Sequence, residues 1–235
     1  MAGLGQDYWK EVITILRSII PIYDKVNRAI SLGQDIKYRE IGINGRVYED
    51  DMVLDAGSGF GNMTLVLSKV LSKVTIVMYD PIFEMLQNGR KYVDSKYAKN
   101  ASCGIFEKMP FKDDSFDVVL CGYSLRDSIN LKDAISEIHR VLKNNGRFVI
   151  VDLGKPDNLL FRSVVSIYLK YFLKVLAFSI SGKMGLKFKT LHGTYLKWPS
   201  NCELYQLLAE KFSKIEMEKR LLGGAIIVGA YKQVT

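Results

Sequence analysis

Short apolar runs alternate with longer segments of helical periodicity through the middle of this 235-residue chain. The runs are rich in Val, Ile and Leu and are bounded by turn residues, which is typical of strands covered on both faces. We expect strands at Met52–Asp55, Val74–Tyr79, near Cys103–Phe106, at Val118–Gly122 and at Arg147–Asp152. We expect helices between them at Asn62–Leu71, Ile82–Tyr97 and Lys132–Leu142. This alternation predicts an α/β fold in which a doubly wound, mostly parallel sheet carries helices on both faces.

The two ends of the chain add elements to this core. Gln6–Ser31 is largely helical in pattern with a break expected at Pro21, and residues 1–45 are assigned to an N-terminal helical cap. The C-terminal part predicts a helix and then a hairpin-like pair of strands, at Asn201–Lys211, Ile215–Lys219 and Ala225–Tyr231. The expectation is one Rossmann-like domain over residues 1–235, whose seven-stranded sheet has an antiparallel C-terminal strand.

A glycine-rich loop follows the first expected strand. Gly57, Gly59 and Gly61 occupy alternate positions just before a helix, so a ligand can approach backbone N–H groups there. The dinucleotide pattern G-x-G-x-x-G places its third glycine one residue later, and the carboxylate of Asp55 would repel a pyrophosphate. S-adenosylmethionine carries an ammonium and a sulfonium group but no phosphate, so the loop favours this cofactor over NAD. A plain strand-to-helix turn is the alternative.

A second acidic residue follows at the spacing of a nucleoside site. Asp80 ends the second expected strand, about twenty residues beyond the loop, where doubly wound folds place a carboxylate on ribose hydroxyls. Pro81 and Ile82 are placed to pack on an adenine face. Asp80 is also suited to cap the helix expected after it, and one residue can serve both roles. The loop and this acid together predict a nucleoside-type cofactor.

Further motifs make the chain similar to a known family. They are Tyr23-Asp24-Lys25-Val26-Asn27, Leu54–Gly61, Asp80 with Gly89-Arg90, Glu107–Phe111, Leu125-Arg126-Asp127, Arg140-Val141-Leu142-Lys143, Tyr195-Leu196 and Gly223–Lys232. With them the chain resembles the class I S-adenosylmethionine-dependent methyltransferases and, among these, the UbiE/COQ5 C-methyltransferases of ubiquinone and menaquinone synthesis. The likeness covers nearly the whole chain apart from the first few residues and roughly Asn158–His192.

The resemblance implies an S-adenosylmethionine-dependent C-methyltransferase that acts on a lipid-soluble isoprenoid quinone or quinol precursor. The expected cofactor-binding residues are Asp55, Gly57, Ser58, Gly59, Phe60, Asp80, Pro81, Ile105, Phe106 and Gly122. Two of them depart from the family pattern. Phe60 stands where a small or hydroxyl residue is usual, and Ile105 stands where Asn or Asp often meets the adenine amino group.

C-methylation of a hydroquinone is helped by a base that removes a phenolic proton or by a cation that stabilises the phenolate. Arg126 is the first candidate, because it follows the fourth strand and stays charged in a dry site. A structural ion pair with Asp127 or Asp24 is the alternative. Asp127 is a further candidate, since it replaces the Asn of the family's L-R-N motif and changes the charge beside Arg126. Tyr23 and Tyr195, which match family positions, are candidates to hydrogen-bond a ring oxygen, with packing as the alternative.

An amphipathic helical insertion is expected at residues 157–197. At 100° per residue, one arc of Asn158–Lys183 holds polar residues: Arg162, Ser163, Ser166, Lys170 and Lys174. The opposite arc holds Phe161, Val164, Val165, Tyr168, Leu169, Phe172, Val175 and Leu176. No apolar run here is long enough to span a bilayer. The helix either packs on the domain as a cap or makes a peripheral membrane contact through residues 158–189, and covering a lipid-binding cleft would satisfy both.

Composition limits the partners, the kinds of site and the cellular location that we expect. The net charge of +8 permits an anionic membrane or nucleic acid as partner, but the chain lacks the N-P-P-[YF] motif of flipped-base amine methylation, and no nucleic acid is expected. Three separated cysteines and two histidines predict neither a disulfide framework nor a metal site. With no signal peptide recognised, we expect a cytoplasmic protein, peripheral on the inner face of the cell membrane if the helix binds there. A homodimer is compatible with the sequence.

Two other functions remain open from the sequence. One is a methyltransferase for another small-molecule or lipid acceptor. The altered L-R-N segment and the insertion are compatible with this alternative. The other is a non-catalytic partner that binds S-adenosylmethionine within a biosynthetic complex.

Overall fold

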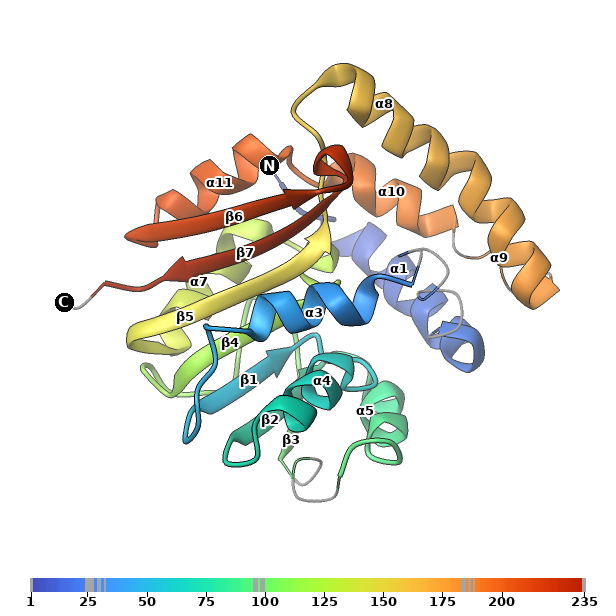
Figure 1. Ribbon diagram of the computed structural model, residues 1–235. Helices are drawn as coiled ribbons and strands as arrows, with labels where there is room; N and C mark the ends of the chain where they lie inside the picture. Colours follow the sequence, from blue (N-terminus) through green and yellow to red (C-terminus); the bar gives the residue numbers. More distant parts are fainter. Residues whose placement is uncertain are drawn as a thin grey trace.

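A seven-stranded sheet forms the centre of the computed structural model, which describes residues 2–23, 28, 31, 33–94, 97, 100–182, 185, 187 and 189–233. The strands are β1 (Met52–Ala56), β2 (Thr75–Asp80), β3 (Ala101–Cys103), β4 (Phe116–Gly122), β5 (Leu142–Leu153), β6 (Lys214–Arg220) and β7 (Ala225–Tyr231). Their order is β3-β2-β1-β4-β5-β7-β6, and only β7 runs against its neighbours (Figure 1). The doubly wound fold expected from the sequence is confirmed.

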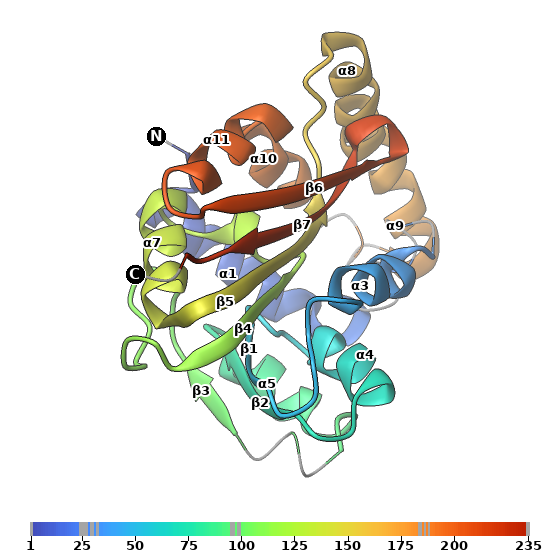
Figure 2. The same ribbon diagram turned by 60° about the vertical axis from the view of Figure 1, so that its left-hand side comes forward.

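Helices cover both faces of this sheet (Figures 1 and 2). One face carries α3 (Asp35–Ile43), α4 (Asn62–Val70) and α5 (Phe83–Gly89), and the other carries α7 (Leu131–Val141) and α11 (Asn201–Ala209). Each face has its own apolar core: Ile43, Leu67 and Leu86 pack in one, and Ile135, Ile138 and Leu208 pack in the other. Burial on both faces explains why the central strands read as continuous apolar runs.

Side-chain caps fix the starts of two of these helices. Asn130 accepts hydrogen bonds from the backbone N–H groups of Lys132 and Asp133 at the start of α7. Ser200 and Glu203 form a reciprocal capping box at the start of α11. Both caps satisfy N–H groups that have no partner inside the helix.

Three sequence expectations needed correction. The helix expected at Ile82–Tyr97 is shorter, because α5 ends at Gly89, which lies against the backbone of Phe60. The strand expected near Cys103–Phe106 is β3, at Ala101–Cys103, since the chain turns away at Gly104 to place Phe106 at a cavity. The strand expected at Arg147–Asp152 begins earlier, at Leu142, and contains Asn145 in the left-handed region at φ 60° where its register with β4 shifts.

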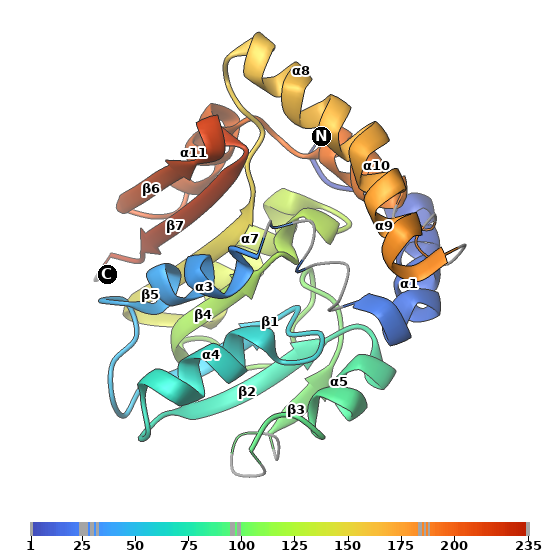
Figure 3. The ribbon, with the colours of Figure 1, turned by 45° about the vertical axis from the view of Figure 1, so that its right-hand side comes forward.

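Helices from both ends of the sequence gather at the carboxyl ends of the parallel strands. They are α1 (Gln6–Ile19), α8 (Leu159–Ile167), a π-helical turn (Tyr168–Phe172), α9 (Leu173–Ser181) and α10 (Lys189–Lys197). As expected, α1 stops before Pro21, in a 3₁₀ turn at Ile20–Ile22. Residues 159–181 form one continuous rod, the outer rod, which crosses α10 and the end of α1 (Figure 3).

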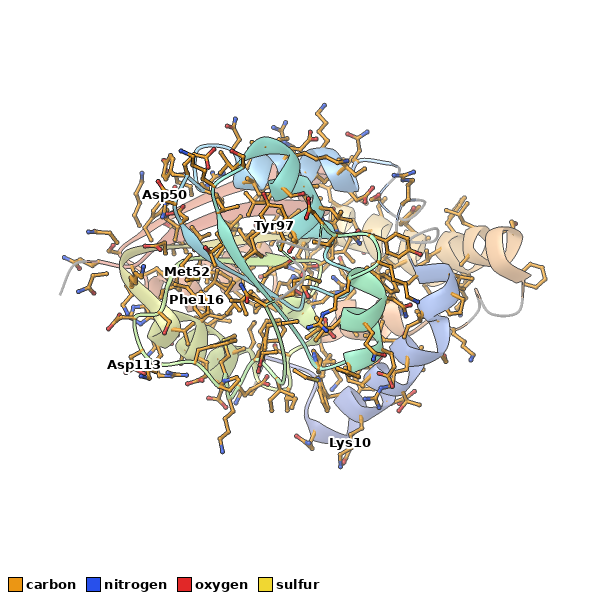
Figure 4. The ribbon with its side chains drawn as sticks, turned by 90° about the horizontal axis from the view of Figure 1, so that it is seen from below. Lys10, Asp50, Met52, Tyr97, Asp113 and Phe116 are labelled. Atoms are coloured by element: carbon orange, nitrogen blue, oxygen red, sulfur yellow. The ribbon has the colours of Figure 1, made fainter. Side chains whose placement is uncertain are left out.

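The opposite end of the sheet is free of these helices. Figure 4 shows Met52 and Phe116, the first residues of β1 and β4, close together at that end, whereas α1 and the outer rod lie at the far end. The N-terminal helices and the helical insertion therefore surround the edge where doubly wound folds bind their ligands.

Candidate active site

Backbone hydrogen bonds join the loop that follows β1 to the end of β2. The N–H groups of Gly57 and Ser58 donate to the carbonyl oxygen of Tyr79 at 2.7 and 3.0 Å. Gly57 has φ 68°, and a Cβ there would collide with the side chain of Ser124 after β4. Only glycine suits both the backbone angle and this close approach. The loop is thus held between the ends of β2 and β4.

Asp80 completes this connection with its side chain. Its two carboxylate oxygens accept hydrogen bonds from the backbone N–H groups of Gly59, at 2.9 Å, and Ile82, at 2.8 Å. Burial raises the pKa of Asp80 to about 7, although both hydrogen bonds act to lower it. The carboxylate therefore spans the loops that follow β1 and β2 and lies in the wall of the cavity between them.

Asp55 lies deeper, beneath the glycine loop. It is fully buried, and its Oδ2 accepts hydrogen bonds from the N–H group of Thr64 at 3.1 Å and from its hydroxyl at 2.7 Å. Its Oδ1 is buried with no hydrogen-bond partner, and burial raises its pKa to about 6. An unpartnered buried carboxylate oxygen fits a cationic ligand nearby, although Asp55 itself does not line the cavity.

The cofactor cavity has a volume of about 510 Å³ and opens at the ends of β1, β2 and β4. Its walls include Gly57, Gly59, Asp80, Pro81, Ile105, Phe106, Tyr23 and Asp127, all expected at the site from the sequence. Ile82, expected to pack on the adenine, lines it as well, whereas Met85, Tyr123 and Ser124, together with Trp9, Ile13 and Leu16 of α1, were missed. The apolar spacing of α1 predicts a packed face but not what that face covers.

Besides Asp55, three expected cofactor residues lie outside this wall. The ring of Phe60 packs with Ile13 and Met85 and meets Tyr23 edge-on, at a centroid distance of 5.7 Å. A Cβ at Gly122 would lie 2.6 Å from Cγ of Met63, so this glycine permits close packing of α4 rather than a ligand contact. Ser58 is buried, and its backbone takes part in the loop described above.

A second cavity, the acceptor cavity, lies on the other side of Tyr123. It has a volume of about 560 Å³. Its lining residues are Ser31, Asp35, Tyr38, Arg39, Tyr123, Arg126, Leu153, Leu191, Leu221, Gly224 and Ala225. Tyr123 also lines the cofactor cavity and has φ 63°, an unusual angle for a tyrosine. This residue is therefore a partition shared by the two cavities.

Arg126 reaches the acceptor cavity from a buried cluster of charges. Its Nη1 lies 2.5 Å from Oδ1 of Asp152, and its Nε lies 3.8 Å from Oδ1 of Asp127. Burial acts to lower the pKa of Arg126, but the charges of Asp152 and Asp127, with a smaller effect of Tyr23, together outweigh it, so the pKa lies above its usual value. The pair with Asp127 that was considered from the sequence therefore exists, but the closer partner, Asp152, was not considered; Asp24 lies outside the described residues.

Asp127 is not in the wall of the acceptor cavity, but it directly follows Arg126, which is. It lines the cofactor cavity and also a smaller cavity of about 370 Å³, which it shares with Arg126 and Tyr23. Burial raises the pKa of Asp127 to about 6, while Arg126 lowers it and Asp152 raises it. A group with this pKa is able to exchange protons near neutral pH.

Tyr195 does not line any of these three cavities. It is buried against Leu169 and Leu173 of the outer rod, and its hydroxyl donates to the carbonyl oxygen of Arg162 at 3.5 Å. Its position corrects the expectation of a hydroxyl at the acceptor and corresponds to the packing alternative. Tyr23, in contrast, lines both the cofactor cavity and the smaller cavity.

These features fit S-adenosylmethionine. The glycine loop exposes backbone, Asp80 offers a carboxylate, Ile105 and Phe106 offer apolar faces, and the buried oxygen of Asp55 favours a cation. Among the residues that the structure describes, no cluster of side chains suits a metal ion. Fold and site together define an S-adenosylmethionine-dependent methyltransferase.

Comparison with known proteins makes the assignment narrower. A model of the ubiE/COQ5 methyltransferase family matches residues 3–232, and the chain belongs to this family. A ubiquinone/menaquinone biosynthesis C-methyltransferase UbiE from Geotalea uraniireducens is 32% identical over 200 residues, covering 82% of this chain and 83% of that protein. A demethylmenaquinone methyltransferase from Symbiobacterium thermophilum is 30% identical over 223 residues, covering 90% and 88%.

Solved structures support the fold. A putative S-adenosyl-L-methionine-dependent methyltransferase from Methanococcus maripaludis has a TM-score of 0.62 at 22% identity, covering 93% of this chain and 92% of that one. A possible histamine N-methyltransferase from Thermotoga maritima has a TM-score of 0.63 at 15% identity, covering 92% and 99%. At such identities the likeness concerns the fold alone.

Proposed function

We propose that this protein transfers a methyl group from S-adenosylmethionine to a ring carbon of a lipid-soluble isoprenoid quinol precursor. The observation that carries the proposal is that the cofactor and acceptor cavities share Tyr123, while the adjacent residues Asp127 and Arg126 line one cavity each. The names of its relatives support the same acceptor class, since they include ubiquinone/menaquinone biosynthesis and demethylmenaquinone methyltransferases.

The cavity walls suit the two parts of such an acceptor. Leu153, Leu191, Leu221 and Ala225 offer apolar surface to a prenyl-substituted ring. Arg126 brings a permanent positive charge to the same cavity, where it would favour a phenolate oxygen over the neutral phenol. The apolar walls would exclude water and align the ring.

Asp127 is our candidate for the proton acceptor. Loss of a phenolic proton shifts electron density onto the ring carbon, which then bonds to the methyl group as the carbon–sulfur bond breaks. Because the pKa of Asp127 is raised only to about 6, the side chain is largely ionised at neutral pH and able to take this proton. The ring regains aromaticity when the hydrogen on the methylated carbon leaves as a proton.

Analysis of cellular quinones tests this function. Deletion of the gene should cause accumulation of a quinone lighter by one methyl group, and the wild-type gene should restore the normal mass. An Arg126→Ala variant should keep its affinity for S-adenosylmethionine but fail to restore the quinone. An unchanged quinone pool in the deletion strain, with another methylated lipid or metabolite missing, would assign a different acceptor.

We also place the enzyme on the inner face of the cell membrane, held there through residues 158–189. This segment is basic and its rod is apolar on the side that faces away from the domain. In the described part of the chain, no helix has both the length and the apolar character needed to cross a bilayer. A homodimer that buries the same surface is the alternative, and sedimentation at several protein concentrations distinguishes the two.

A further inference from the structure

The outer rod is apolar on two sides. Leu169, Leu173 and Ala177 are buried against the domain. A second set of apolar side chains recurs every three or four residues on the opposite side and is 50–69% exposed: Leu160, Val164, Ile167, Tyr171, Val175 and Phe178. We call this set the outer stripe. It differs from the arc expected from the sequence, because Arg162 and Ser166 turn inward, where they bond to Pro156 and His192.

The β6–β7 hairpin carries a second exposed apolar feature, the leucine tip. Leu221 and Leu222 both have positive φ angles, of 49° and 55°, and are 54% and 70% exposed. This backbone region disfavours side chains with a Cβ, and glycine or asparagine is the usual occupant. Both side chains are exposed at backbone angles that leucine disfavours, which favours a contact with another molecule as the reason for leucine here.

The outer stripe and the leucine tip belong to one corner of the molecule. A Cβ placed on Gly224, beside the tip, would lie 3.0 Å from Cγ2 of Val165 in α8. Figure 2 shows the turn between β6 and β7 next to the outer rod. The two features therefore present apolar side chains from neighbouring elements.

The charge along the helical insertion has one sign. Residues 158–202 contain no Asp or Glu but contain seven basic residues: Arg162, Lys170, Lys174, Lys183, Lys187, Lys189 and Lys197. Lys170 and Lys197 are exposed in the structure. Exposed apolar side chains flanked by lysines match a surface of acidic headgroups above acyl chains.

We propose that the outer stripe and the leucine tip together bind an anionic lipid bilayer and that the acceptor cavity opens at this contact. The second part of the proposal, that the cavity opens at the bilayer, is supported by Leu221. This residue belongs both to the exposed tip and to the wall of the acceptor cavity. A prenyl tail is then able to remain in the bilayer while its ring enters the cavity. That second part rests on the proposed function, whereas bilayer binding does not.

Vesicle co-sedimentation with the full chain tests the contact without any methyl transfer. The wild type should bind phosphatidylglycerol vesicles and bind phosphatidylcholine vesicles much more weakly, and high salt should reduce the binding. Val164→Glu and Leu222→Glu should each lower the affinity about tenfold or more, because each places a charge among acyl chains. Val70→Glu is the matched control: Val70 is 56% exposed on α4 and Val164 is 57% exposed on α8.

The outcomes separate the alternatives. Unchanged binding of Val70→Glu with loss in the two other variants supports the proposal, provided that all three variants melt like the wild type. No binding of the wild type to phosphatidylglycerol, or equal losses in all three variants, overturns it. A wild-type dimer that Val164→Glu converts to a monomer, with no vesicle binding, would assign the outer stripe to a second copy of this chain. A normal quinone pool in the deletion strain would contradict the proposed acceptor but leave the vesicle result standing.

Discussion

The guanidinium of Arg126 and the carboxylate of Asp152 form a buried ion pair with a 2.5 Å contact between Nη1 and Oδ1. Asp152 ends the apolar part of β5, and Arg126 follows β4, so the pair joins the ends of two adjacent strands. It also holds the arginine at the wall of the acceptor cavity.

Removal of Asp152 should therefore be costly for the fold. Asp152→Ala leaves Arg126 buried without its nearest counter-charge, and we expect the free energy of unfolding to fall by about 3–5 kcal/mol. Asp152→Asn retains an acceptor and should lose less. Glu210→Gln is the control, since it weakens the exposed Lys132–Glu210 pair and should cost less than about 1 kcal/mol. Similar losses in urea denaturation for Asp152→Ala and Glu210→Gln would contradict a structural role for the buried pair.

Asp80→Ala should weaken S-adenosylmethionine binding severely. The variant removes both the carboxylate in the cavity wall and the acceptor for the N–H groups of Gly59 and Ile82. Hydrogen bonds to a charged group contribute about 1.5–3 kcal/mol each, so we expect affinity to fall by about tenfold to a hundredfold or more. Calorimetry measures this, with Glu84→Ala on the exposed side of α5 as the control. Unchanged affinity in the Asp80 variant would refute the ribose assignment.

Asp127→Asn tests the proton acceptor and also restores the residue that the family pattern has at this position. We expect kcat on a demethylated quinol to fall by about a hundredfold or more while KM changes little. The wild-type rate should rise with pH and level off above about 6, because the carboxylate must be ionised to accept a proton. In Asp127→Asn this rise of the rate with pH should be absent, and in Asp127→Glu part of the rise should return. A variant with full kcat and the same profile would show that an amide suffices.

Asp55 should make the cofactor-free protein less stable as the pH rises. Its pKa is raised by burial from 3.8 to about 6, so between these values the folded chain keeps a proton that the unfolded chain loses. Each pH unit in this window costs about 1.4 kcal/mol, or about 3 kcal/mol in all. The Tm of the wild type, measured relative to the Tm of Asp55→Asn, should therefore fall between pH 4 and about 6 and stay constant at higher pH. A constant difference between the two melting curves across this window would exclude a raised pKa.

The strand ends were predictable because their signals are local. Asp55, Gly57 and Asp80 each follow an apolar run, and parallel strands bring such ends to one edge of the sheet. The buried charge cluster around Arg126 was only partly predictable. Arg126 was identified, but its partner Asp152 lies 26 residues away on the neighbouring strand, and nothing in the local pattern specifies that pairing.

Residues on the helices were harder to place. Apolar periodicity identified the outer rod, yet both of its sides are apolar, so the sequence did not indicate which side packs on the domain. Tyr195 matched a family position, but its burial beneath the rod depends on the packing of α10. The same limit applied to α1, whose apolar face meets the cofactor cavity rather than the sheet.

Helix α1 has a further consequence. Its Ile13 and Leu16 form part of the wall of the cofactor cavity, and its last residue, Ile19, packs against Ala177 of the outer rod. One short helix is therefore in contact with the structures that we assign to the methyl donor and to the lipid. If α1 shifts when the donor enters, the packing beneath the rod shifts with it. By thermodynamic reciprocity, the factor by which the donor changes the affinity for the bilayer must then equal the factor by which the bilayer changes the affinity for the donor.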